Sequence, residues 1–314
     1  MSALKDIWVL SEKPEMLAEL CAGARFLGSN VTALVIGKEE EAEKASKSGA
    51  DKVYWLGEIT GDRIFEDYTD TIYDLITKEN PELFLFGASK RVKLIAGRLA
   101  ARLRTSVLTD IIELKVEGYD LQAKRLVYGG LAVRTEMSTS QTVLALVGRG
   151  VFTAPKDYGF QGNIYRISSD KVESSVKWLE KRVKSGESVD LTAAKKVIGV
   201  GRGLKRQEDL QLIYDLAKTL NAEVACSRPL AEGLNWLPRE RYIGVSGAVI
   251  KPDLYFAIGI SGQVQHMVGV NQARTIVAIN SDKTAPIFAQ ADYGLVGDLY
   301  KVLPLLIEMC SEAK

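Results

Sequence analysis

The sequence is poor in the residues that build metal centres, disulfide frameworks and hydrolytic sites. It has one histidine, His266, and its three cysteines, Cys21, Cys226 and Cys310, stand far apart and form no CxxC pair. Zinc and iron–sulfur ligation therefore have no support, and we expect no metal. The odd, scattered cysteines favour a reducing compartment without disulfides. One histidine without a serine elbow argues against a hydrolase triad, and an HExxH zinc motif is absent.

An excess of one charge and long apolar runs are also missing. Forty-one Lys and Arg residues face 40 Asp and Glu residues, which leaves a net charge of +1 and no sign of the basic surface of a nucleic-acid-binding protein. No apolar run approaches the roughly 18–20 residues that span a bilayer. The opening residues, Met1–Asp6, lack the basic and apolar parts of a signal peptide. We expect a cytoplasmic protein with no nucleic-acid partner and no transmembrane segment.

The 314 residues are too many for one ordinary core and indicate two α/β domains. The first half alternates strand and helix, which predicts a parallel sheet between layers of helices. From Ile111 strands follow one another, which indicates a strand-rich extension. The expected strands are Ile7–Leu10, Val31–Ile36, Val53–Leu56, Leu83–Phe86, Ile111–Val116, Leu121–Tyr128, Leu131–Glu136 and Thr142–Leu146; the expected helices are one from Pro14 with Leu17, Leu20, Cys21 and Ala24 on one face, then Lys38–Lys47, Phe65–Lys78 and Val92–Leu103.

A polar, charge-rich stretch runs from about Tyr158 to Leu191. It is interpreted either as a solvated linker with some helix or, around Lys177–Lys184, as a basic docking patch. The predicted domains are therefore residues 1–190, an α/β domain with its linker, and residues 191–314, a Rossmann-like domain. The second domain begins with the run Lys196–Gly203, and we expect further strands at Ala222–Ala225, Tyr242–Val245, Leu254–Ile258 and Thr275–Ile279, a helix with Leu210, Ile213, Tyr214, Ala217 and Leu220 on one face, and a final helix Leu299–Glu312.

A glycine pattern, Gly199-x-Gly201-x-Gly203, lies between a predicted strand and a predicted helix. Such a turn can cradle a phosphate, but G-x-G-x-G is a weak motif and is equally typical of a tight turn. An NAD site also requires an acidic residue at the end of the next strand. That strand ends instead in Ser227 and Arg228, which disfavours NAD and places an arginine where a ligand would lie.

The only histidine follows a second glycine-containing turn, Gly259-Ile-Ser-Gly-Gln-Val-Gln-His266. Ser261 is predicted to cap a helix, and Gly262 to let the backbone approach a ligand closely. The first-turn amides would then form an anion site, with Gly262 and His266 on one helical face. A lone histidine is more often structural than functional, and this setting keeps both interpretations open. Asn280 and Asp298 are interpreted either as turn and cap residues or as ligand-binding residues at a strand edge.

Several longer motifs in order resemble the alpha subunit of electron-transfer flavoproteins. The resemblance is dense from Val197 to the C-terminus and looser before it, where Gly87–Ser89 and Thr109–Ile112 also match. It is greatest for an enteric branch linked to acyl-CoA or carnitine metabolism. The motifs are Ser227-Arg228, Gly259–His266, Val277–Asn280, Ala285–Phe288 and Ala291–Asp298.

The resemblance implies a heterodimer in which a smaller beta subunit contacts the N-terminal domain and the C-terminal domain binds one FAD. The pair would carry electrons between a dehydrogenase and an acceptor such as a quinone oxidoreductase or an acyl-CoA/carnitine reductase system, and would not make bonds itself. By matching motif, Arg228 would lie against the flavin ring, His266 would reach its pyrimidine oxygen, and Ser246 would lie near N5. The full set of implied cofactor-binding residues is Arg202, Ser227, Arg228, Gly244, Val245, Ser246, Ser261, Gly262, Gln263, Val264, Gln265, His266, Asn280, Asp298 and Leu299.

One stretch departs from the family pattern. Many relatives read Val-Gly-Gln-Thr-Gly where this chain reads Ile243-Gly-Val-Ser-Gly247. Ser246 keeps the hydroxyl, but Val245 cannot replace the glutamine amide. Two other functions are alternatives: an NAD(P)-dependent oxidoreductase, which predicts NADH binding, and a nucleotide-binding regulatory module, which predicts ATP binding and no retained flavin.

Overall fold

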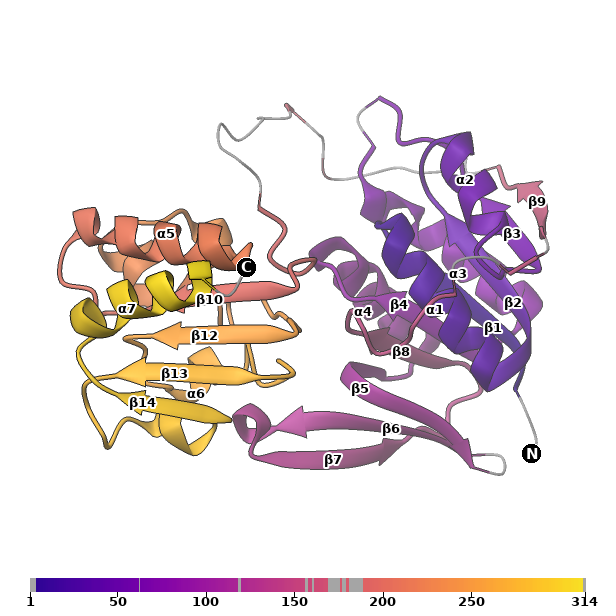
Figure 1. The fold of residues 1–314 in the computed structure, drawn as a ribbon. Helices are drawn as coiled ribbons and strands as arrows, with labels where there is room; N and C mark the ends of the chain where they lie inside the picture. The colour runs from indigo at the N-terminus through magenta and orange to yellow at the C-terminus, as the bar shows by residue number, and fades with distance from the viewer. Residues whose placement is uncertain are drawn as a thin grey trace. The chain divides into compact units, whose positions relative to one another are not determined.

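The computed structural model (Figure 1) describes residues 4–61, 63–117, 120–155, 158–159, 161–168, 176, 179–180 and 189–312. It contains two compact units, Met1–Val127 with Ala132–Arg182, and Tyr128–Leu131 with Val183–Lys314. Of the predicted basic patch Lys177–Lys184, all but Leu179 and Glu180 lies outside the described residues. Among the described helices, none combines the length and apolar character that a membrane crossing requires.

The first unit is built on a nine-stranded sheet in the order β7-β6-β5-β8-β4-β1-β2-β3-β9. Its strands pair in parallel except for β5–β6 and β6–β7, so the predicted parallel sheet with a strand-rich extension is confirmed. The elements are β1 (Leu4–Leu10), α1 (Pro14–Leu27), β2 (Gly28–Val35), α2 (Glu39–Ser46), β3 (Lys52–Trp55), a 3₁₀ turn η1 (Phe65–Tyr68), α3 (Thr69–Glu79), β4 (Leu83–Gly87), α4 (Lys90–Leu103), β5 (Val107–Glu117), β6 (Asp120–Val127), β7 (Ala132–Met137), β8 (Val143–Val147) and β9 (Asn163–Arg166).

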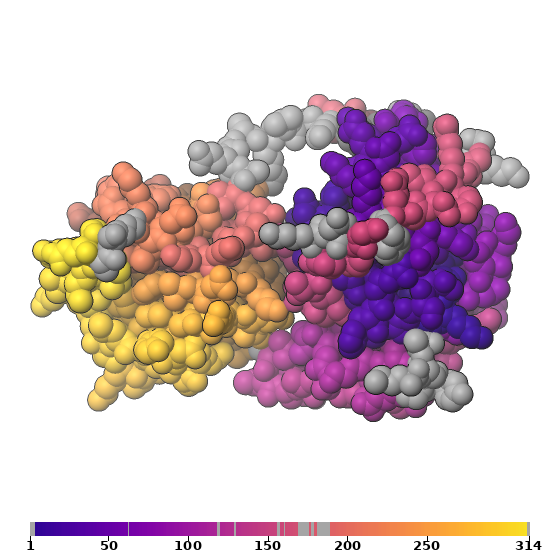
Figure 2. All heavy atoms as spheres, turned by 45° about the vertical axis from the view of Figure 1, so that its right-hand side comes forward, coloured from indigo at the N-terminus to yellow at the C-terminus, as the bar shows by residue number. Residues whose placement is uncertain are grey.

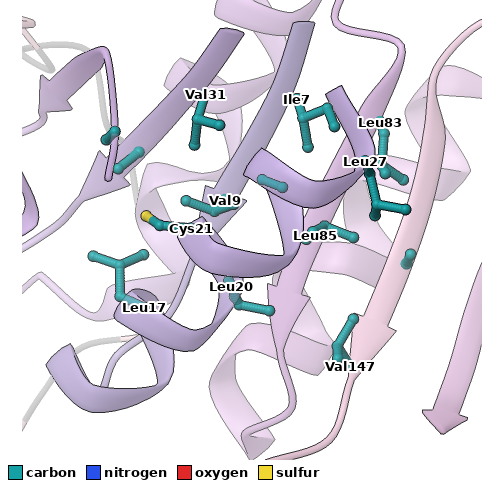
Figure 3. Close-up of a cluster of buried hydrophobic side chains, with 14 of the residues drawn as sticks. Ile7, Val9, Leu17, Leu20, Cys21, Leu27, Val31, Leu83, Leu85 and Val147 are labelled. Carbon is teal, nitrogen blue, oxygen red and sulfur yellow. The ribbon is translucent and has the colours of Figure 1, made fainter. Parts of the chain in front are cut away.

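Helices cover both faces of this sheet because its central strands are buried on both sides. Along β1, Val9 belongs to the core beneath α1 and α2, whereas Trp8 belongs to the core beneath α3 and α4. The predicted face of α1, with Leu17, Leu20 and Cys21, is buried, and Figure 3 shows it over the strands. Burial raises the pKa of the Cys21 thiol to about 12, which makes it an inert core residue.

The edge strand β9 (Asn163–Arg166) corrects the prediction that this stretch is only a linker. It pairs in parallel with β3, and all four of its residues are exposed. Figure 2 shows this part of the chain in pink at the surface of the first unit. The Tyr165 ring packs edge-on against Tyr54 at 6.2 Å, and Arg166 lies over the Trp55 ring at 5.3 Å. An exposed edge strand has no buried face, so its sequence lacks the apolar alternation that would predict it.

Helix α4 begins with a side-chain cap, and this gives a first testable prediction. The Ser89 hydroxyl accepts a hydrogen bond from the Val92 amide at 3.2 Å and donates one to the Glu12 carboxylate. Ser89→Ala should lower the free energy of unfolding of the first unit by about 1 kcal/mol, because the cap is lost. Urea unfolding measures this change. Ser89→Thr, which keeps the hydroxyl, is the control, and equal losses in both variants would contradict the cap.

The second unit is built on a five-stranded sheet in the order β11-β10-β12-β13-β14, parallel throughout. The chain leaves β10 toward β11 and then crosses to β12, so the strand order reverses between β10 and β12. The elements are β10 (Lys196–Val200), η3 (Gln207–Asp209), α5 (Leu210–Leu220), β11 (Glu223–Cys226), a π-type turn η4 (Pro229–Gly233), η5 (Arg239–Arg241), β12 (Leu254–Ile258), α6 (Val264–Met267), β13 (Ile276–Asn280), η6 (Pro286–Ala289), β14 (Tyr293–Val296) and α7 (Leu299–Glu312).

Three details of the second unit differ from the sequence prediction. The predicted strand Tyr242–Val245 is instead a turn held by two isolated bridges, which Tyr242 and Ile243 make. Strand β14, which was not predicted, lies at the sheet edge with all four residues exposed. On α5, Tyr214 is 41% exposed and Leu216 is buried in its place, because the helix packs on the sheet through Leu210, Ile213, Leu216 and Ala217.

Candidate functional site

The residues predicted to bind a ligand come from separate segments, and the sheet topology brings most of them to one edge. Because all five strands of the second sheet are parallel, their carboxyl ends meet at the same side. The arrowheads of β12, β13 and β14 point the same way in Figure 1. The residues in or directly after these strand ends are Arg202, Ser227, Arg228, Ser261, Asn280 and Asp298.

The glycine turn after β10 is packed against the turn after β12. The Gly201 amide donates to the Ile258 carbonyl at 2.9 Å, and the Gly203 amide donates to the Gly259 carbonyl at 3.0 Å. A Cβ added to Gly203 would lie 2.6 Å from the Gly259 Cα. The tight-turn interpretation of the glycine pattern therefore holds for Gly201 and Gly203. The phosphate-cradle interpretation is wrong for these two amides, because they already bind protein carbonyls.

The segment before His266 corrects two predictions. Helix α6 has only four residues and begins after Gln263, so Ser261 is not its cap and Gly262 lies outside it. The Gly262 backbone has φ +83°, and a Cβ there would lie 2.4 Å from the Ile287 nitrogen. The Ile287 amide also donates to the Ser261 carbonyl at 2.9 Å. Gly262 thus permits a close approach of two backbone segments, and the predicted first-turn anion site does not form on so short a helix.

The same segment nevertheless presents polar side chains to solvent. Ser261, Gln263 and Gln265 are exposed, as is Val264, whereas Gly262 and His266 are buried. One hydroxyl and two amides therefore lie along the carboxyl edge, each able to bind a polar ligand.

The turn at Gly244–Ser246 lies beside this segment. The Val245 amide donates to the Gln265 carbonyl at 2.8 Å, and a Cβ on Gly244 would lie 2.7 Å from that same oxygen. The Ser246 hydroxyl lies 3.2 Å from the Tyr242 hydroxyl, and the Val245 side chain is 62% exposed. The structure thus brings together the two stretches that the family resemblance associates with one ring.

His266 is a buried residue, 7% exposed. Its Nε2 lies 2.7 Å from the Tyr255 hydroxyl, while its Nδ1 is buried and has no hydrogen-bond partner among the described residues. Burial lowers the pKa of the imidazole to about 4; the Ile243 backbone lies near enough to the ring to oppose this shift, but it does not meet the distance and angle of a hydrogen bond. At pH 7 the ring is therefore neutral. It can donate a hydrogen bond to a ligand but adds no positive charge.

Two arginines at this edge differ in their surroundings. Arg228 is exposed, and its Nε donates to the Glu232 carboxylate at 2.6 Å, which raises the pKa of the guanidinium further. Glu232 also pairs with Arg239 at 3.2 Å. Arg202 is exposed and forms no ion pair with the part of the chain that the structure describes. Both guanidinium groups face solvent and keep free donors for an anionic or polar ligand.

The remaining predicted residues already serve local structure. The Asn280 amide donates to the Ile260 carbonyl at 2.9 Å, and Asp298 caps α7 by accepting from the Tyr300 amide at 3.0 Å. The Ser227 amide donates to the Val200 carbonyl at 3.0 Å. The Leu299 side chain is buried in the core against α5, so a ligand could meet only its backbone. The turn and cap interpretations of Asn280 and Asp298 therefore hold, with ligand binding left as a second role.

The sequence prediction missed the partner of His266, Tyr255, and the role of Gly199 beside that tyrosine. Tyr255 lies in β12 and is interpreted from the sequence only as part of an apolar strand; Gly199 lies in β10 and is interpreted only as the first glycine of the turn pattern. A glycine inside a strand often marks a close approach of another group, and Gly199 is such a position. The glycine inside the strand could thus have indicated a close contact, but Tyr255 could be identified as the contacting residue only from the pairing of β10 with β12.

The fold is that of a two-unit α/β protein whose second, parallel sheet has exposed polar side chains along its carboxyl edge. Residues 190–271 match the electron transfer flavoprotein FAD-binding domain, and residues 13–172 match the electron transfer flavoprotein domain. The chain is 43% identical over 312 residues to YdiR of Escherichia coli K12, provisionally named an electron transfer flavoprotein subunit, with 99% of this chain and 100% of YdiR covered. It is 39% identical to Protein FixB of Salmonella typhimurium LT2, with 98% of each covered.

This chain therefore belongs to the electron transfer flavoprotein family, as an alpha-type subunit. It contains the family's FAD-binding domain and functions in electron transfer. The resemblance found in the sequence motifs is confirmed.

Proposed function

We propose that residues 191–314 form a Rossmann-like domain that holds FAD along the carboxyl edge of the β10–β14 sheet. The single observation that carries this proposal is the buried, unpartnered Nδ1 of His266 within the described residues of the FAD-binding region. A buried polar atom without a partner is costly, and a bound ligand would satisfy it. The exposed hydroxyl and amides of Ser261, Gln263 and Gln265 on the same segment supply further polar contacts.

When bound, FAD supplies a ring that accepts and releases electrons. Arg228 would lie against this ring, His266 would donate to its pyrimidine oxygen, and Ser246 would present its hydroxyl near N5. Arg228 contributes positive charge and His266 a neutral donor, because its pKa is about 4. Fixed donors and charges of this kind favour a ligand that gains negative charge.

Polar contacts to the rest of the cofactor would come from the other edge residues. These are Arg202, Ser227, Gly244, Val245, Ser261 to Gln265, Asn280, Asp298 and the backbone of Leu299.

The chain's role would be that of an electron carrier that makes no bonds itself. Its one imidazole is neutral and already hydrogen-bonded at Nε2, so it is poorly suited to shuttle protons. Residues 1–190 would contact a beta subunit in a cytoplasmic heterodimer. The donor would be a dehydrogenase, and the acceptor a quinone oxidoreductase or an acyl-CoA/carnitine reductase system.

Co-purification with the beta subunit tests this function. The assembled pair should show a flavin absorption spectrum and release FAD on denaturation. A fully assembled, colourless pair that cannot be loaded with FAD would overturn the proposal.

Arg228→Ala should weaken FAD binding by the assembled pair about tenfold, because an exposed charge-assisted contact to the ring is lost. Equilibrium dialysis or fluorescence titration of the flavin-free pair measures the change. Arg239→Ala is a matched control, since it removes the other cation that Glu232 binds. Equal FAD affinity in the two variants would remove Arg228 from the site.

A further inference from the structure

The histidine at this edge is one half of a buried pair. Tyr255 is fully buried in β12, and its hydroxyl lies 2.7 Å from the His266 Nε2. The hydroxyl fits there because β10 carries Gly199: a Cβ at that position would lie 2.0 Å from the Tyr255 oxygen. Two neighbouring strands and α6 thus combine to place one phenol against one imidazole nitrogen.

Both partners are neutral at pH 7. Burial lowers the pKa of His266 to about 4, so the ring carries a single N–H. Burial also raises the pKa of the Tyr255 phenol, so the phenol keeps its proton. Two arrangements are then possible: the phenol donates to Nε2 and the ring proton sits on Nδ1, or Nε2–H donates to the phenol oxygen and Nδ1 is a bare acceptor.

The surroundings of the phenol distinguish these arrangements. The Tyr255 hydroxyl makes no hydrogen bond to any described residue except His266. If Nε2–H were the donor, the phenol proton would be buried without an acceptor, which is costly. If the phenol is the donor, its proton is used within the pair, and only Nδ1–H is left to meet a ligand.

We propose that Tyr255 is a positioning residue that holds His266 in its Nδ1–H tautomer, so that the imidazole offers the ligand a hydrogen-bond donor and not an acceptor. The group that meets Nδ1 must then be an acceptor, such as a ring carbonyl oxygen. As that group gains negative charge, the bond to Nδ1–H strengthens, whereas a bare nitrogen would repel it. The identity of the ligand rests on the proposed function, but the tautomer is a property of the flavin-free chain.

The single histidine makes the tautomer directly measurable. In the full chain without flavin, ¹⁵N-labelled histidine gives one pair of ring signals, from His266 alone. At pH 7 we expect Nδ1 to be protonated and Nε2 to be a hydrogen-bonded acceptor. A wild-type chain with its proton mainly on Nε2 would overturn the proposal without any variant.

Tyr255→Phe keeps the ring shape and removes only the donor. The ratio of Nδ1–H to Nε2–H should fall about five- to tenfold, the size expected for one lost buried hydrogen bond. Tyr214→Phe, on the exposed side of α5, is the matched control and should leave the ratio unchanged. An unchanged ratio in Tyr255→Phe would overturn the role of Tyr255.

The consequence for the ligand is tested in the FAD-loaded pair with the beta subunit. Tyr255→Phe should lower the flavin reduction potential, in the same direction as His266→Ala and by less. A potential equal to that of the wild type would overturn the positioning role toward the cofactor. Failure of the pair to bind FAD would instead overturn the proposed function, because the tautomer measurement on the flavin-free chain is independent of it.

Discussion

Gly262→Ala should destabilise the second unit by roughly 2–5 kcal/mol. Two costs add at this residue. A side chain at φ +83° is strained by about 1–2 kcal/mol, and its Cβ would lie 2.4 Å from the Ile287 nitrogen, where overpacking costs a further 1–3 kcal/mol. The hydrogen bond from the Ile287 amide to the Ser261 carbonyl lies directly at this contact, so its geometry must give way too.

Urea unfolding of the flavin-free chain measures this loss. Gly233→Ala is the matched control in the same unit, because a Cβ there meets nothing within 4 Å and the backbone is not left-handed. The control should change the free energy of unfolding by less than about 1 kcal/mol. If both alanine variants unfold at the same urea concentration, the close approach of Gly262 to Ile287 is contradicted.

Lowering the pH from 7 to 5 should also destabilise the second unit. The contribution of His266 to this loss in the free energy of unfolding should be about 2 kcal/mol. The folded-state pKa of His266 is about 4, below its ordinary value of 6.5. Above pH 6.5 both states are neutral and the contribution is complete. Below it the unfolded chain binds a proton that the folded chain refuses, so folding is progressively disfavoured down to about pH 4.

The comparison variant for this prediction is His266→Gln, measured by urea unfolding at several pH values without flavin. Its loss of stability between pH 7 and pH 5 should be smaller than that of the wild type by about 2 kcal/mol. Because the chain has no second histidine, carboxylates dominate the remaining dependence and are common to both proteins. Parallel pH profiles for the two proteins would show that His266 is not held neutral by burial.

Local pattern was sufficient to predict the elements that pack on a core. The spacing of Leu17, Leu20, Cys21 and Ala24 predicted the buried face of α1, because a helix on a sheet must bury one apolar stripe. The same reasoning failed for β9 and β14, whose residues are exposed at sheet edges and carry no such stripe. It also misplaced Tyr214, since four apolar positions already fill the inward face of α5.

For the candidate site, too, the sequence could predict some features and not others. Sequence motifs identified the segments that meet at the carboxyl edge, because the ends of parallel strands must converge there. They could not predict that Ser261 is displaced from its capping position, because that depends on Ile287, which lies 26 positions along the chain. Nor could they pair Tyr255 with His266, because the contact needs the register of β12 beside Gly199.

Under the proposed function, the contact between the glycine turns after β10 and β12 bears on the rate of electron transfer. These turns are joined backbone to backbone, through Gly201 and Gly203, and the atoms nearest to a Cβ at Gly203 are all backbone atoms of Gly259. Because few groups in this framework can move, its dipoles rearrange little when the charge on a nearby ligand changes. A small reorganisation energy lowers the barrier to moving an electron in either direction.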